Sequence, residues 1–194
     1  PGTLLMNFIG VKLFGFSETG PIFIQMLLQI TALTLMFIAV RKLYGAFAAC
    51  ASVILASLYL SSPLLAKFGN VKEQFMIAFM IISASCFIMS QLSARRWWVW
   101  LLACGAAAVN IYYFKQTGAS VIIAIAIYLV AKLILDLKNF RRIAREIIVL
   151  ICGGFIGMVP LSMFYIWQNQ FDRLKNTLPM YGLISLFSIV VLGV

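Results

Sequence analysis

The feature that most constrains the fold is a series of long apolar runs separated by short polar connections. A helix that spans the hydrocarbon core of a bilayer needs about 20 largely apolar residues. Runs that reach or approach this length lie at residues 21–40, 46–65, 74–92, 97–114, 118–135 and 147–167. A further run occupies 178–194, while 1–15 is apolar but short, as in an interfacial or half-inserted helix. The pattern predicts an all-α transmembrane bundle of six complete spans and a truncated seventh.

Composition agrees with a lipid environment. Apolar residues make up 64% of the 194 residues, and the mean hydropathy is +1.07. Charged residues make up 10%, against about 25% in soluble domains. The spans leave no room for a soluble domain, so residues 1–194 read as a single transmembrane unit. Because the chain starts at Pro1 and stops within an apolar run, we expect it to be a piece of a longer polypeptide.

The charged residues predict an orientation, because cytoplasmic loops of membrane proteins are enriched in Lys and Arg. Alternate connections carry most of the cations. The predicted cytoplasmic set is Arg41, Lys42, Arg95, Arg96, Lys132, Lys138, Arg141, Arg142 and Arg145. The predicted external set is Lys12, Lys67, Lys72, Lys115, Arg173 and Lys175, diluted by Glu18, Glu73 and Asp172. The net charge of +10 therefore reports topology, and nucleic acid is not an expected partner.

Other residue types limit the chemistry. The chain has no His, which removes the commonest general base and metal ligand. The four Cys lie in apolar runs without a CxxC pair, which favours a role as small buried hydrophobes. The six external cations exceed what topology requires, so an anionic ligand on that side would account for them.

Polar and small residues within the spans have structural and functional interpretations. Gln25 and Gln29 lie four residues apart on one helical face, which favours hydrogen bonding between helices over a ligand site. For Asn110, interhelical bonding and cavity lining are equally good interpretations. The spacing of Gly153 and Gly157 favours close helix packing, and Pro160 predicts a kink.

Two segments on the predicted external side suggest a site. Glu73 would open a helix in a segment that also contains Lys67, Asn70 and Lys72, where a carboxylate is stabilised by the helix dipole whether or not it is functional. Lys115 follows the aromatic residues 112–114 and precedes Gln116. A Lys in this position either extends to the membrane surface or binds a phosphate.

These segments carry a resemblance to a known family. The chain resembles the GT-C superfamily of membrane glycosyltransferases, in particular the dolichyl-phosphate-mannose-protein mannosyltransferase-like proteins. The resemblance rests on residues 1–15, on Val-Arg-Lys-Leu-Tyr-Gly at 40–45, on 61–73, on Phe-Lys-Gln-Thr-Gly at 114–118 and on 164–172. The order and spacing of these segments carry it, since none is specific alone.

The resemblance implies transfer of a sugar from a polyprenyl-phosphate donor to a lipid, glycan or protein acceptor on the external face. It places the main catalytic base upstream of Pro1 and makes Glu73 a secondary acidic residue. The implied donor-binding residues are Lys115, Lys67, Lys72, Asn70 and Gln116. No cofactor is required by these residues, although a divalent metal at the donor phosphate is compatible with them. A bacterial inner (plasma) membrane is the implied location, and the residues do not specify an oligomeric state.

Two other functions fit the same residues. A transporter or flippase of lipid-linked sugars would also need external cations and an apolar groove, but the sequence has no convincing internal repeat. A non-catalytic membrane scaffold within a larger assembly is the third interpretation. An acidic loop directly before Pro1 would favour the enzyme over both.

Overall fold

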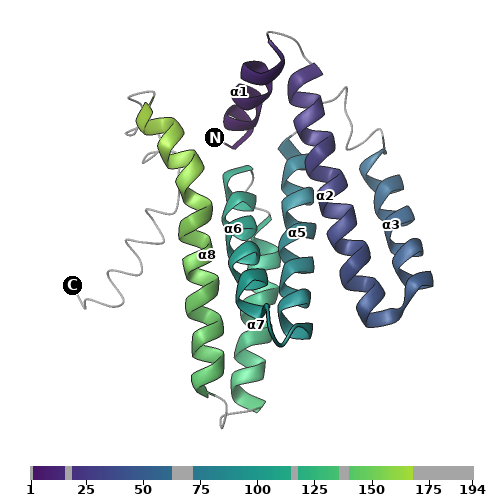
Figure 1. Cartoon of the computed structure of the whole chain (residues 1–194), viewed down its shortest axis with the longest axis vertical. Coiled ribbons are helices and arrows are strands. Elements are labelled where there is room, and N and C mark those ends of the chain that lie inside the picture. Colours follow the sequence, from purple (N-terminus) through teal and green to yellow (C-terminus); the bar gives the residue numbers. More distant parts are fainter. Residues whose placement is uncertain (1, 16–18, 63–71, 115–117, 136–139, 168–194) are drawn as a thin grey trace.

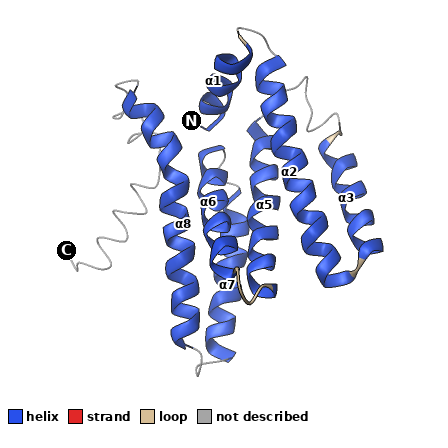
Figure 2. Ribbon diagram, viewed as in Figure 1, coloured by secondary structure: helices blue, strands red, loops and turns tan. Residues whose placement is uncertain are grey.

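The structure is a bundle of helices. The computed structural model describes residues 2–15, 19–62, 72–114, 118–135 and 140–167, and none of these residues belongs to a strand (Figure 2). The helices are α1 (Gly2–Phe14), α2 (Thr19–Tyr44), α3 (Ala46–Leu60), α5 (Lys72–Leu92), α6 (Trp97–Phe114), α7 (Ala119–Leu135) and α8 (Phe140–Trp167). The predicted all-α membrane bundle is confirmed.

Among the described residues, fewer helices reach the length of a membrane span than the six predicted. Within the described residues, four helices are long and apolar enough to cross a membrane, namely α2, α5, α6 and α8. Helices α3 and α7 have 15 and 17 residues, so they measure about 22 and 26 Å against a hydrocarbon core of about 30 Å. Helix α3 ends at Leu60 because Pro63 disfavours helical backbone in the residue before it. The predicted truncated span at 178–194 lies outside the described residues.

The helices other than α1 run side by side along the long axis of the molecule, and α1 lies at one end (Figure 1). Successive helices reverse direction, as short connections require. Between α2 and α3 the turn is made at Gly45, whose φ of 90° is in the region that favours glycine. Helices α5 and α6 form the centre of the bundle, where Phe75, Leu101 and Ile111 are fully buried.

Small residues allow α6 and α8 to pack with their backbones in contact. A Cβ atom added to Gly105 would collide with the carbonyl oxygen of Leu150. Added to Gly153 it would collide with the carbonyl oxygen of Leu102, and added to Gly157 it would lie 2.6 Å from that of Ala106. The packing role predicted for the α8 glycines is confirmed, and Gly105 is their partner on α6.

One helix boundary and two cysteines differ from the sequence-based expectations. Helix α8 begins at Phe140, so residues 140–146, expected in the connection before the span at 147–167, are helical. Pro160 lies inside this helix, and Figure 1 shows its last turns leaning outward. Cys86 and Cys104 are buried as expected, whereas Cys50 and Cys152 face outward. In a membrane this exposure needs no explanation, because lipid solvates apolar side chains.

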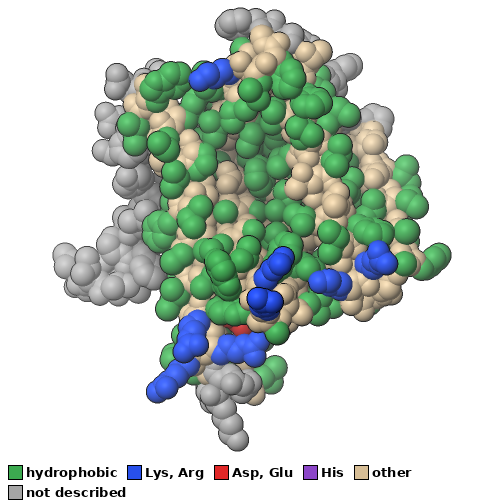
Figure 3. Space-filling view, viewed as in Figure 1, with side chains coloured by type: hydrophobic (Ala, Val, Ile, Leu, Met, Phe, Trp, Pro, Cys, Tyr) green, Lys and Arg blue, Asp and Glu red, His purple; other side chains and the backbone are tan. Residues whose placement is uncertain are grey.

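The surface has an apolar middle and one basic end. Large hydrophobic side chains are exposed on every helix, and they cover most of the face in Figure 3. Lys and Arg gather at the end where α2, α5 and α7 finish and α6 and α8 begin (Figures 1 and 3). We call this the basic end. Its described cations are Arg41, Lys42, Arg95, Arg96, Lys132, Arg141, Arg142 and Arg145. The other end is called the opposite end.

Candidate functional site

The predicted acidic residue lies at the opposite end, in the first turn of α5. Glu73 is half-buried, and its Oε2 atom is shielded from solvent. Lys72 precedes it and is exposed. The N-terminus of a helix carries a partial positive charge, which favours the ionised carboxylate in this position. The first turn of α5 therefore presents one carboxyl group and one exposed Lys at the end of the bundle away from the basic end.

A network of glutamines fixes this turn of α5 to its neighbours. Gln25 and Gln29 of α2 both donate their side-chain N–H groups to Oε1 of Gln74, the latter over 3.2 Å. Gln74 in turn donates to the carbonyl oxygen of Leu60, at the end of α3, over 3.4 Å. The predicted interhelical role of the two α2 glutamines is confirmed. Their acceptor, Gln74, is adjacent to Glu73, so the network holds the backbone that carries the carboxylate.

Aromatic stacking brings the end of α6 to the start of α5. The Phe114 ring stacks on Phe75, with centroids 5.3 Å apart and planes 9° apart. Phe75 follows Glu73 by two residues, and Phe114 directly precedes Lys115 in the sequence. The described parts of the two segments singled out in the sequence therefore meet at this end of the bundle.

Helix α1 packs across the same end, where an interfacial or half-inserted helix was predicted. Its Gly10 lies against the backbone of Gly20 and Pro21, so α1 and the start of α2 touch without intervening side chains. Leu5 packs in a cluster with Tyr113 of α6 and with residues of α8. The helix thus connects α2 to the ends of α6 and α8 and covers part of the opposite end.

One predicted external cation is held by aromatic rings. Lys12 Nζ lies 5.9 Å from the centroid of Phe8 and 5.5 Å from that of Trp167. Cation–π contacts of this kind position an ammonium group without neutralising it. The charge of Lys12 is therefore available to an anion at this end. The other proposed binding residues, Lys67, Asn70, Lys115 and Gln116, lie outside the described residues, as do Arg173 and Lys175.

Asn110 contributes to packing. Its side chain donates to the carbonyl oxygen of Ala106, one turn earlier in α6, over 2.8 Å. It also donates to the carbonyl oxygen of Gly157 in α8 over 3.4 Å. Of the two interpretations left open by the sequence, the structure supports the interhelical bond.

The described residues contain no group of three or more His, Cys, Asp or Glu side chains close enough to hold a metal ion. At the opposite end Glu73 is the described carboxylate.

The sequence did not reveal an ion pair at the basic end. Lys132 of α7 lies 2.9 and 2.8 Å from the two carboxylate oxygens of Glu146 in α8, and it donates to Gln91 of α5 over 2.8 Å. The Glu146 side chain is only 4% exposed, and Arg142 Nε lies 3.5 Å from it. An acidic residue directly before an apolar run was the available signal.

The fold and its two different ends define an all-helical integral membrane protein that places polar groups at the boundaries of the membrane. The family described as dolichyl-phosphate-mannose-protein mannosyltransferase matches residues 1–167, so this chain belongs to that family of GT-C type membrane glycosyltransferases. No curated protein and no solved structure matches the chain.

Proposed function

We propose that this chain forms part of an enzyme that moves a sugar from a polyprenyl-phosphate donor to a lipid, glycan or protein acceptor. In this proposal the basic end faces the cytoplasm, in line with the positive-inside rule. The donor phosphate and the acceptor then meet at the opposite end, on the external face. A bacterial inner membrane is the proposed location, from the family resemblance.

The observation that carries the proposal is the contact between α5 and α6 at the opposite end. Phe114 stacks on Phe75. In the sequence Lys115 directly follows Phe114, while Lys72 and Glu73 lie three and two residues before Phe75. A carboxylate and two cations on neighbouring segments suit a reaction in which a phosphate leaves. Lys12 adds a further positive charge at the same end.

The chemistry follows from the bonds that change. The acceptor hydroxyl oxygen attacks the anomeric carbon of the sugar while the bond from that carbon to the phosphate oxygen breaks. The acceptor loses its proton to a carboxylate, and the polyprenyl phosphate departs with the bonding electrons. Negative charge grows on the phosphate, so cations placed beforehand lower the barrier. Lys115, with Lys67 and Lys72, is assigned to the phosphate, and Asn70 and Gln116 to donor binding. Glu73 is assigned the role of secondary acidic residue.

The test is a transfer assay with the full-length protein in membranes and a radiolabelled polyprenyl-phosphate sugar. Lys115→Ala and Glu73→Gln should each lower the transfer rate by about 100-fold. Arg141→Ala, at the basic end, is the control and should leave the rate unchanged. If both site variants transfer at the normal rate, the site assignment is wrong. Movement of the labelled donor across the membrane without transfer would support the transporter instead.

A further inference from the structure

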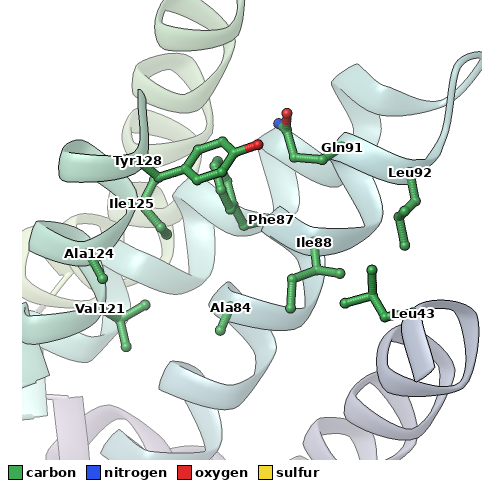
Figure 4. Close-up of a pocket in the computed structure, with 10 residues that line it drawn as sticks. All are labelled: Leu43, Ala84, Phe87, Ile88, Gln91, Leu92, Val121, Ala124, Ile125 and Tyr128. Carbon is green, nitrogen blue, oxygen red and sulfur yellow. The ribbon is translucent and has the colours of Figure 1, made fainter. Parts of the chain in front are cut away.

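A groove lies on the surface of the bundle near the basic end. It is bounded by α5, by α7 and by the last turn of α2, and its volume is about 430 Å³ (Figure 4). Pockets of about 300–1,000 Å³ commonly hold small ligands. From Leu92 at the end of α5 the lining extends back to Ala84, which is about 12 Å along the helix. The groove therefore reaches from the membrane boundary into the depth occupied by lipid chains.

The walls of the groove are apolar, and its polar groups lie near the basic end. Phe87 and Ile125 form buried parts of the lining, while Ala124 and Tyr128 are exposed along its edge. The Tyr128 ring packs edge-on against Phe87 with centroids 5.3 Å apart. Figure 4 shows its hydroxyl oxygen directed toward Gln91. An apolar chain with a polar group at one end matches this arrangement.

Three cations lie close in sequence to residues that line that end of the groove. Leu43 lines the groove and directly follows Lys42, while Leu92 lines it and is followed by Arg95 and Arg96 in the short α5–α6 connection. These three cations are exposed, and no ion pair within the described residues involves them. The described carboxylate at this end, Glu146, is already held by Lys132 and Arg142. The rim therefore carries uncompensated positive charge.

We propose that this groove binds one anionic glycerophospholipid, with an acyl chain between α5 and α7 and the phosphate among Lys42, Arg95 and Arg96. The charge at the rim selects an anionic headgroup, which the cytoplasmic leaflet supplies. A zwitterionic lipid would bring its own cation into an already positive rim. The bound lipid fills the gap between α7 and the rest of the bundle and so holds this short helix in place. The inference does not depend on the proposed transfer reaction.

A second groove on the other side of α7 provides the control. It is lined only by apolar residues, among them Ala126, and its volume is about 240 Å³. Ala124 and Ala126 are both exposed and lie two residues apart on α7. Replacing either by Trp adds the same bulk to the same helix. Of the two substitutions, only the one at Ala124 fills the groove whose rim is basic.

The experiment reconstitutes the full-length protein in vesicles of phosphatidylcholine and phosphatidylglycerol in equal amounts. Native mass spectrometry then measures which lipid stays bound on release from the bilayer. The unaltered protein and Ala126→Trp should retain phosphatidylglycerol in preference to phosphatidylcholine, and Ala124→Trp should lose it. Lys42→Gln and Arg95→Gln should each lower the preference about fivefold, whereas Arg141→Gln should not change it.

Three outcomes would overturn the proposal. The first is retention of the two lipids in the vesicle ratio by the unaltered protein. The second is an undiminished preference in Ala124→Trp. The third is an equal loss of preference in Arg141→Gln and Lys42→Gln, which would indicate general attraction to the basic end. Should Ala124→Trp fail to fold, the comparison of Lys42→Gln with Arg141→Gln decides alone.

Discussion

At the scale of single residues, the Glu146 carboxylate is the buried acidic group of the described bundle, and it needs partners for its charge. A buried charge is costly unless it is paired and hydrogen-bonded. Lys132 meets both carboxylate oxygens and also donates to Gln91, so the pair ties α7 to α5 and to α8 at once. Few side chains of α7 are buried, Ile125 and Leu129 among them. This ion pair therefore carries a large share of the attachment of α7.

Removing the cation alone should destabilise the protein. Lys132→Met leaves Glu146 buried beside Arg142, and the free energy of unfolding should fall by about 3 kcal/mol. The double variant Lys132→Met, Glu146→Leu removes both charges and should recover most of this loss. Thermal unfolding of the full-length protein in detergent measures both effects. A double variant less stable than Lys132→Met would show that the cost does not come from the unpaired carboxylate.

At the scale of helices, the packing of α6 on α8 depends on which glycine faces the partner. Gly153 and Gly154 are adjacent in the sequence and both are buried. A Cβ on Gly153 would collide with backbone, whereas one on Gly154 would lie 3.2 Å from the movable side chain of Val109. Backbone cannot move aside without separating the helices, but a side chain can. Gly153 is therefore required for the close approach of α6 and α8, whereas Gly154 is not.

Substitution of Gly153 and of Gly154 by Ala should change the stability of the protein by different amounts. Gly153→Ala should lower stability by about 1–3 kcal/mol, because overpacking forces the helices apart. Gly154→Ala should cost far less, since Ala favours helix by about 1 kcal/mol over Gly and the clash is mild. Thermal unfolding of the two variants, compared with the parent protein, measures the difference. Equal losses would contradict close backbone packing at Gly153.

At the scale of the whole molecule, the two ends differ in charge and in packing. The basic end gathers cations from three connections, while the opposite end carries Glu73, the glutamine network and α1. Because loops rich in Lys and Arg stay in the cytoplasm, this difference predicts the orientation of the entire bundle. The proposed transfer site and the proposed lipid groove would then face opposite sides of the membrane.

Cysteine accessibility tests this orientation. In a full-length protein with its native cysteines replaced by Ala, Ser61→Cys and Ala94→Cys place single thiols at exposed positions at the two ends. A membrane-impermeant maleimide should label Ser61→Cys in intact cells. It should label Ala94→Cys only after the membrane is opened. Labelling of Ala94→Cys in intact cells would reverse the assigned orientation.

Much of the fold was predictable from local properties of the chain. Apolar runs and the alternation of charge specify a helical membrane bundle and its polarity, because hydropathy and loop charge act segment by segment. The glutamines of α2 and the glycines of α8 were also predictable as contact residues, since their spacing places them on one helical face. The site assignments of Glu73, Lys115, Lys67, Lys72, Asn70 and Gln116 stay predictions to be tested by the transfer assay.

The sequence by itself therefore determined the lipid environment, the all-helical class and the concentration of Lys and Arg at one end of the bundle. The tertiary structure decided which residues meet. That Gln74 receives the α2 glutamines, that Gly105 faces α8 and that Lys132 reaches Glu146 all depend on how far each helix is rotated and shifted along its neighbours. Rotation and shift result from the packing of all the helices together. Only the assembled bundle therefore brings Leu43, Phe87 and Tyr128 around one groove.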